Sequence, residues 1–209
     1  MPDYNADITN EMKKRAAYVC NGASNHSNIE RQSEDYYATD PDALCKLLDT
    51  YNEFSPNIWE CACGGNHLAN VLKERGFNVR CTDIIDRTHD GTIEVMDFLS
   101  QNEKFDGDII TNPPYKYVTE FVNKAIDTVT DGHRVMMFLK LTFLESSKRR
   151  KLFESTPPEF LYVSTKRIQC AMNGDFVTYK KGTGTAVAYG WFIWRKGFTG
   201  EPTIRWFNY

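Results

Sequence analysis

The chain has 209 residues, 41% of them hydrophobic, and a formal net charge of −3 at pH 7. This length predicts one domain with a sizeable core, and no apolar stretch approaches the ~18 residues that a membrane-spanning helix needs. The amino terminus is polar, and the six cysteines show neither paired nor zinc-binding spacing. We therefore expect a cytoplasmic protein with reduced thiols, no secretory signal, no membrane segment and no metal.

Residues 1–35 are polar, and we interpret them as an arm that precedes a domain over residues 36–209. Within the domain, helix-like and strand-like patterns alternate. The predicted helices cover residues 41–51 (with Asp40 as N-cap), 67–75, 117–129 and 145–155. The predicted strands cover residues 57–61, 77–81, 92–96, 107–111, 134–139, 160–164, 186–195 and 203–207. This alternation predicts an α/β fold, with a mostly parallel sheet covered on both faces and an antiparallel hairpin at its edge.

The charge is distributed unevenly along the chain. Residues 132–209 contain 13 Lys and Arg against 5 Asp and Glu, which leaves 12 against 23 for residues 1–131. A basic half and an acidic half in one domain are typical of a protein that binds a polyanion on one face. The alternative is that both halves are solvated surface.

The tetrapeptide Asn112-Pro113-Pro114-Tyr115 is the most informative motif. It follows an apolar strand-like run and precedes a helix-like stretch, so it lies where open α/β sheets bind ligands. Two prolines stiffen the backbone and remove two N–H donors. The Asn112 side-chain oxygen and the Pro113 carbonyl then offer two acceptors beside the Tyr115 ring, which suits a planar exocyclic amine such as N6 of adenine.

This tetrapeptide resembles the catalytic motif of S-adenosylmethionine-dependent N6-adenine DNA methyltransferases, and the chain resembles their small, phage-like type. The resemblance covers residues 36–196 in the order of elements. It implies a Rossmann-like methyltransferase fold with a seven-stranded, mostly parallel sheet, S-adenosylmethionine as cofactor and DNA as partner. It also implies that the catalytic loop, residues 112–115, directs methyl transfer to a flipped adenine.

A second loop, residues 60–66, begins at the end of the predicted strand 57–61 and leads into a predicted helix. Its small residues allow close approach of a ligand, and the helix N-terminus supplies N–H donors. The loop resembles the methyltransferase cofactor motif, acidic-x-x-x-Gly-x-Gly, with Glu60 and Gly64 at matching positions and Ala62 between them. Asn66 replaces the last glycine, and asparagine tolerates left-handed dihedrals better than most residues.

Further cofactor contacts are predicted at the ends of the next strands. Asp83 lies roughly 20 residues beyond Glu60, the spacing of an acidic ribose clamp, which would also fit an NAD enzyme. By resemblance, Asp97 accepts from the adenine amine, Phe98 contributes a backbone N–H and an apolar wall, and Phe121 covers the other adenine face; core packing is the alternative for Phe121. The expected cofactor residues are Tyr37, Thr39, Glu60, Ala62, Gly64, Asp83, Ile84, Asp97, Phe98, Asn112 and Phe121. Tyr37 and Thr39 belong to a motif that resembles the one that holds the methionine carboxylate.

Basic residues in the carboxyl half are the candidates for binding phosphates. The predicted nucleic-acid-binding residues are Lys148, Arg149, Arg150, Lys166, Arg167, Lys180 and Lys181. The last four bracket a glycine-containing loop, residues 165–185, which is a candidate target-recognition element. A solvated surface loop is the alternative.

Other functions fit the same motif. An RNA adenine methyltransferase would use the same site, and a protein-glutamine methyltransferase would also present a planar amide. N4-cytosine methylation fits less well, because those enzymes usually carry serine at the position of Asn112. A catalytically inert nucleic-acid-binding module is the alternative from another class.

Overall fold

The computed structural model describes residues 37–168, 170–172 and 187–208. The predicted arm (residues 1–35), Lys180, Lys181 and most of the 165–185 loop lie outside these residues. In the part that is described, no helix is both long enough and apolar enough to cross a membrane.

The elements follow the predicted alternation closely. The strands are β1 (Tyr37–Thr39), β2 (Asn57–Glu60), β3 (Asn78–Asp83), β4 (Glu94–Val95), β5 (Asp108–Thr111), β6 (Arg134–Lys140), β7 (Phe160–Ser164), β8 (Cys170–Met172), β9 (Tyr189–Arg195) and β10 (Thr203–Phe207). The α-helices are α2 (Pro41–Thr50), α3 (His67–Glu74), α4 (Val118–Thr128) and α5 (Arg150–Ser155), and the 3-10 helices are η1 (Tyr115–Tyr117), η2 (Leu141–Leu144) and η3 (Ser147–Arg149).

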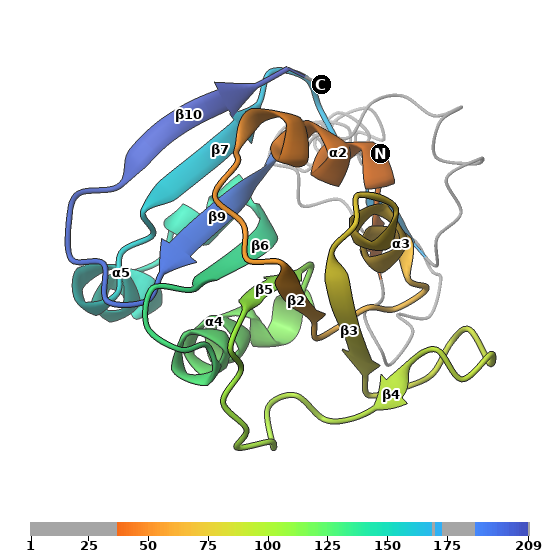
Figure 1. Ribbon diagram of the computed structural model, residues 1–209. Coiled ribbons are helices and arrows are strands. Elements are labelled where there is room, and N and C mark those ends of the chain that lie inside the picture. The colour runs from red at the N-terminus through yellow and green to blue at the C-terminus, as the bar shows by residue number, and fades with distance from the viewer. Residues whose placement is uncertain (1–36, 169, 173–186, 209) are drawn as a thin grey trace, which may run out of the picture. The chain divides into compact units, whose positions relative to one another are not determined.

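Eight of the described strands form one sheet, in the order β10-β7-β9-β6-β5-β2-β3-β4 (Figure 1). Neighbours are parallel except at β9, which is antiparallel to both β6 and β7. The predicted α/β class with a mostly parallel sheet is confirmed, with eight strands in place of seven. The antiparallel strand lies inside the sheet, and β10 forms the edge parallel to β7. This placement agrees with burial, because six consecutive residues of β9 are buried, as in a strand covered on both faces.

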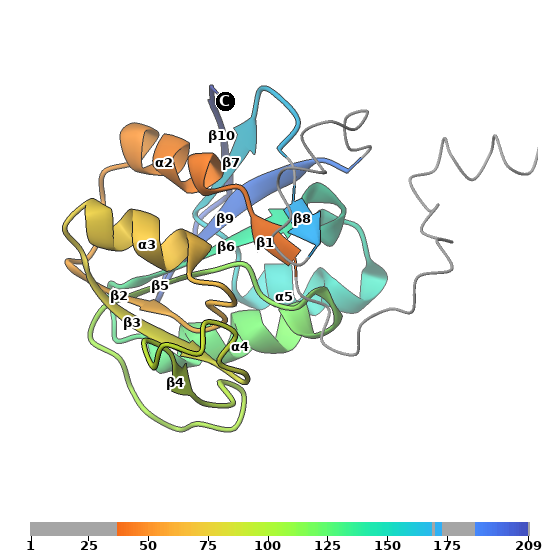
Figure 2. The ribbon, with the colours of Figure 1, turned by 90° about the vertical axis from the view of Figure 1, so that its right-hand side faces the viewer.

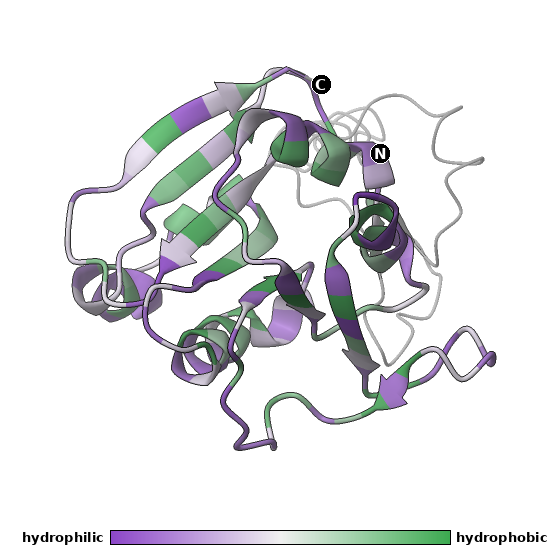
Figure 3. Ribbon diagram, in the orientation of Figure 1, coloured by the Kyte–Doolittle hydropathy of each residue, from purple (hydrophilic) through white to green (hydrophobic). Residues whose placement is uncertain are grey.

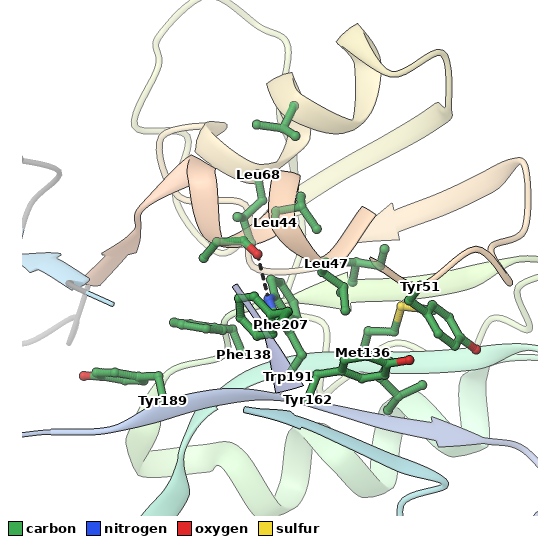
Figure 4. Packing of buried hydrophobic residues seen from close by; sticks show 14 of the residues in the cluster. Leu44, Leu47, Tyr51, Leu68, Met136, Phe138, Tyr162, Tyr189, Trp191 and Phe207 are labelled. Carbon is green, nitrogen blue, oxygen red and sulfur yellow. Dashed lines mark hydrogen bonds between the residues drawn. The ribbon is translucent and has the colours of Figure 1, made fainter. Parts of the chain in front are cut away.

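Helices cover both faces of the sheet (Figure 1). Alternate residues of each strand point to opposite faces, so neighbours such as Met136 and Met137 belong to two separate apolar clusters. On one side, Leu44 and Leu47 of α2 pack over the strands, and the Trp191 ring nitrogen donates to the Ala43 carbonyl at 3.1 Å (Figure 4). On the other side, α4 and α5 cover the sheet. Hydrophobic residues accordingly run along the central strands (Figure 3).

The predicted start of α2 is confirmed and the predicted helix at residues 145–155 is not. The Asp40 side chain caps α2 by accepting from the Asp42 amide at 3.2 Å. In the second segment, the α-helix begins only at Arg150, after the turn of η3. The Ser146 hydroxyl accepts from the Lys148 amide at 3.2 Å, and this local bond competes with regular helix formation.

One pairing was not predicted. β1 and β8 form a separate two-stranded antiparallel ribbon, in which Thr39 lies opposite Cys170 (Figure 2). The ribbon brings the predicted methionine-carboxylate motif next to a segment that follows it by more than a hundred residues.

Candidate active site

The predicted site residues follow three strands that are neighbours in the sheet. β5, β2 and β3 lie side by side and parallel, so their carboxyl ends meet at one edge. Glu60 ends β2, Asp83 ends β3, and Asn112 follows β5. The structure therefore brings the cofactor loop, the acidic residue of β3 and the catalytic loop to the same edge, where such sheets bind ligands.

The cofactor loop turns through left-handed backbone at two positions. Gly64 has φ of 54°, and Asn66, in place of the expected glycine, has φ of 63° and ψ of 15°. The predicted tolerance of asparagine for this conformation is confirmed. The Asn66 side-chain amide donates to the Thr92 hydroxyl at 2.9 Å, and the Gly64 amide donates to the Asp83 carboxylate at 2.8 Å. These bonds tie the loop to the end of β3.

Glu60 is the most unusual residue of this edge. Glu60 is only 1% exposed, and burial raises the pKa of its carboxyl group to about 8. The Thr111 hydroxyl and the Ala62 backbone amide lie close enough to lower this pKa in part. Within the described residues, however, neither carboxylate oxygen has a partner in full hydrogen-bond geometry, and the same holds for the buried hydroxyls of Thr39 and Thr111. Each buried polar group left in this state costs roughly 1–3 kcal/mol. A ligand that brings its own charged and polar groups would satisfy them.

Asp83 is held in a fixed orientation. One carboxylate oxygen accepts from the Gly64 amide, and the other accepts from the Ile85 amide and the Arg87 guanidinium, both at 3.1 Å. The next residue, Ile84, is 64% exposed at the same edge. An apolar side chain beside a fixed carboxylate suits a nucleoside, with the carboxylate toward ribose and the isoleucine toward the base.

The residues predicted to enclose adenine differ in their exposure to solvent. The exposed Asp97 carboxylate accepts from the Leu99 amide at 3.0 Å and from the Ser100 hydroxyl. Phe98 and Phe121 are both buried and stack directly on each other, with ring centroids 5.4 Å apart. The contacts therefore favour core packing for Phe121, because no base fits between two rings in contact.

The catalytic loop leads into η1, where the Tyr117 amide donates to the Pro114 carbonyl at 3.0 Å. Tyr115 packs against the apolar clusters of both sheet faces. Its hydroxyl lies 3.3 Å from that of Tyr189, and burial raises the pKa of Tyr115 well above its ordinary value. The Lys140 ammonium lies over the Tyr115 ring, 4.2 Å from the centroid.

The β1–β8 ribbon lies close to the same loop. The pKa of the Cys170 thiol is raised to about 11, because the effect of burial exceeds the opposite effect of hydrogen bonds with the Tyr115 and Tyr189 hydroxyls. Since Thr39 is paired with Cys170, its unsatisfied hydroxyl belongs to this edge as well. The side chain of Tyr37 is not among those that the structure describes.

The predicted phosphate-binding residues that the structure describes differ in their contacts. The Arg149 guanidinium donates to the Phe143 carbonyl at 2.7 Å and the Thr142 carbonyl at 3.2 Å, so it holds the chain after β6. Arg150 pairs with Glu154 at 2.6 Å. Lys148, Lys166 and Arg167 are exposed.

The structure adds residues that sequence reasoning missed. Thr111 precedes the catalytic loop directly, and Lys140 ends the strand beside it. Lys140 also lines a pocket of about 190 Å³ beside Tyr115. The remaining lining residues are Lys116, Val118, Thr119, Leu139, Thr142, Phe143 and Arg149. In the sequence, Lys140 stands out only as a single charged residue at the end of an apolar strand, which is a weak signal.

No protein-family model matches the sequence, and no curated protein sequence matches it. Solved structures do match the fold. A candidate class I S-adenosylmethionine-dependent methyltransferase from Listeria monocytogenes has a TM-score of 0.57 at 13% identity, covering 95% of this chain and 72% of that one. A candidate RNA methyltransferase from Pyrococcus horikoshii has a TM-score of 0.52 at 13% identity, covering 79% and 89%.

The M protein of the type I restriction enzyme EcoKI is also similar, with a TM-score of 0.51 at 15% identity. The match covers 89% of this chain and 47% of that one. Identities this low show a similarity of fold alone, and the solved structures with this fold include proteins named as S-adenosylmethionine-dependent methyltransferases. The chain has the α/β fold that these methyltransferases share.

Proposed function

We propose that the protein transfers a methyl group from S-adenosylmethionine to N6 of a flipped adenine in DNA. The observation that carries this proposal is the buried carboxyl group of Glu60, which lies near Thr111 beside the catalytic loop and has no positively charged partner among the described residues. A folded protein keeps such a group at a cost of stability, and the cationic amino group of S-adenosylmethionine is a partner of matching charge.

The residues at this edge fit the other parts of the cofactor. We assign the ribose hydroxyls to Asp83, the adenine ring to Ile84 and the methionine carboxylate to the Thr39 hydroxyl. Gly64 and its left-handed turn allow the backbone to approach the ligand closely. Tyr37, Ala62, Asp97 and Phe98 remain proposed contacts, whereas the stacking of Phe121 on Phe98 argues against a direct role for Phe121.

S-adenosylmethionine supplies an electrophilic methyl group on a positively charged sulfur. The protein must then orient and activate the adenine amine. The Asn112 side-chain oxygen and the Pro113 carbonyl accept its two hydrogens, which favours a nucleophilic nitrogen and stabilises the positive charge that develops on it. Pro114 keeps the loop rigid, and Tyr115 provides a ring on which the base stacks after leaving the duplex.

DNA is the proposed substrate because the Asn-Pro-Pro-Tyr motif resembles that of adenine DNA methyltransferases, and because one structural neighbour is the M protein of a restriction enzyme. The likeness to a candidate RNA methyltransferase, which the chain covers to 89% of its length, favours RNA as the second candidate. Both polymers present the same adenine edge, so the catalytic residues would be the same.

The test is incubation of purified protein with S-adenosylmethionine and matched DNA or RNA strands, followed by mass spectrometry of the nucleosides. We expect N6-methyladenine from DNA; product from RNA alone would move the assignment to RNA. Asn112→Ala should abolish turnover and keep cofactor binding, measured by calorimetry, while Asn123→Ala on the exposed face of α4 should keep both. Normal methylation by Asn112→Ala, or no cofactor binding by the wild type, would refute the proposal.

A further inference from the structure

The pocket beside Tyr115 is basic. Lys116, Lys140 and Arg149 contribute to its wall, together with the hydroxyls of Thr119 and Thr142. No aspartate or glutamate occurs among its described lining residues. Three cationic side chains around about 190 Å³, with hydroxyl donors beside them and no carboxylate, favour an anionic ligand.

The three cations differ in how firmly they are held. Arg149 is fixed by its bonds to the carbonyls of Thr142 and Phe143 and by the Phe143 ring, 4.7 Å from its guanidinium carbon. The Lys116 ammonium lies 5.0 Å from the centroid of the Tyr117 ring, and that of Lys140 lies 4.2 Å from that of the Tyr115 ring. Such contacts are weak unless the cation is fully desolvated, and both lysines are at least partly exposed. A phosphate can therefore draw both lysines away from their rings at small cost.

Lys140 also covers the surface that the target base needs. It ends β6, the strand paired with β5, and its ammonium lies over the face of the Tyr115 ring. A base can stack on that face only after the ammonium has moved aside. The neighbouring pocket offers the lysine a new position, provided that an anion is present there to pair with it.

We propose that this pocket binds a backbone phosphate adjacent to the target nucleotide, and that Lys140 moves from the Tyr115 ring to this phosphate as the base stacks on the ring. The inference rests on the proposed function for the identity of the polymer. Lys116 is the second movable contact, and Arg149 is the fixed one. In a nucleic acid the phosphate and the base are covalently linked, so one strand can displace Lys140 and take its place on Tyr115 at the same time.

The experiment measures binding of a short, adenine-containing single strand at several salt concentrations. We compare the wild type with the double variant Lys116→Gln/Lys140→Gln and with the control Lys104→Gln. Lys104 pairs with Asp127 and lies before β5, at the opposite edge of the sheet. For one lost phosphate contact, the slope of log affinity against log salt should become shallower by ~0.7 in the double variant. The control should keep the wild-type slope.

A neutral methylphosphonate, placed in turn on either side of the adenine, then identifies the phosphate. At one position it should weaken binding to the wild type and leave the double variant unaffected, because that variant has already lost the contact. Equal losses for both proteins at every position, or an unchanged salt slope, would overturn the inference. So would full competition by millimolar inorganic phosphate, which would identify a site for a free anion.

These measurements require no methyl transfer. A strand that is bound through the pocket but not methylated would contradict the proposed function and leave the phosphate site intact. Methylation together with an unchanged salt slope would support the proposed function and contradict the phosphate site.

Discussion

Replacing Glu60 by glutamine tests the central feature of the site, because it removes a charge and keeps the shape of the side chain. Burial raises the pKa of this carboxyl from 4.5 to about 8, so it holds its proton at neutral pH in the folded protein. In the unfolded chain it is ionised above its ordinary pKa. Folding at neutral pH therefore requires the carboxyl to take up a proton, and glutamine removes this requirement.

The sign follows from linkage. Below pH 4.5 both states are protonated and the carboxyl costs nothing; between 4.5 and about 8 the unfolded state alone releases the proton, so stability falls as pH rises. Each pH unit in that window is worth about 1.4 kcal/mol. Between pH 5 and pH 8 the wild type should lose roughly 3 kcal/mol of unfolding free energy relative to Glu60→Gln.

Urea denaturation of both proteins at several pH values between 5 and 8 measures this difference directly. The two stability curves should diverge as the pH rises, with the variant the more stable at pH 8. The same variant should bind S-adenosylmethionine weakly, because an amide cannot pair with the cofactor's amino group as a carboxylate does. Parallel stability curves would show that Glu60 is not buried as a neutral acid, and unchanged cofactor affinity would remove it from the site.

Three further outcomes follow from the same edge of the sheet. Cofactor affinity should rise up to tenfold per pH unit as the pH approaches 8, because Glu60 must give up its proton to bind, and calorimetry in buffers of different ionisation enthalpy should detect that proton. Arg87→Gln should raise cofactor affinity by removing a competitor for the Asp83 carboxylate, which isothermal titration can measure. Asn66→Gly should keep the melting temperature near that of the wild type, whereas Asn66→Ala should cost roughly 1–2 kcal/mol, because only the former suits a left-handed backbone.

The parts of the site that sequence could predict depend on local rules. Asp40 caps a helix through its own side chain, and Asn66 takes a left-handed conformation within one turn. The ends of β2, β3 and β5 lie close to where apolar runs stop. Once these strands are parallel neighbours, Glu60, Asp83 and Asn112 converge at one edge without any further information.

The parts that sequence missed depend on contacts between distant segments. An apolar run such as β9 reads as a strand, but its place between β6 and β7 is decided by which faces are left to cover. The β1–β8 ribbon joins two short segments, neither of which shows a periodic pattern of its own. Phe98 and Phe121 are each suitable for contact with adenine, and only the fold shows that they stack on each other.

Two buried acidic side chains on neighbouring strands, Asp108 and Glu60, differ in how far the protein itself supplies their hydrogen-bond partners. Asp108 begins β5 at the amino edge of the sheet, and Glu60 ends β2 at the carboxyl edge. Asp108 is completely buried, and its two oxygens accept from the amides of Ser55 at 2.7 Å and Arg134 at 2.8 Å, with the His133 ring 3.4 Å away. Glu60 is buried to a similar degree, but among the described residues its oxygens have no hydrogen bond of comparable geometry, although the Thr111 hydroxyl and the Ala62 amide lie near them.

The equivalent substitutions should therefore have opposite effects. Asp108→Asn places an amide donor against backbone donors. It should cost about 3 kcal/mol of stability, because charge-assisted hydrogen bonds are lost and a backbone amide is left buried without an acceptor. Cofactor affinity should not change, because Asp108 lies at the edge away from the site. Glu60→Gln should instead stabilise the protein above neutral pH and weaken cofactor binding. If both substitutions destabilised the fold to a similar extent and left cofactor binding intact, Glu60 would be a structural residue like Asp108, and the site would lose its principal support.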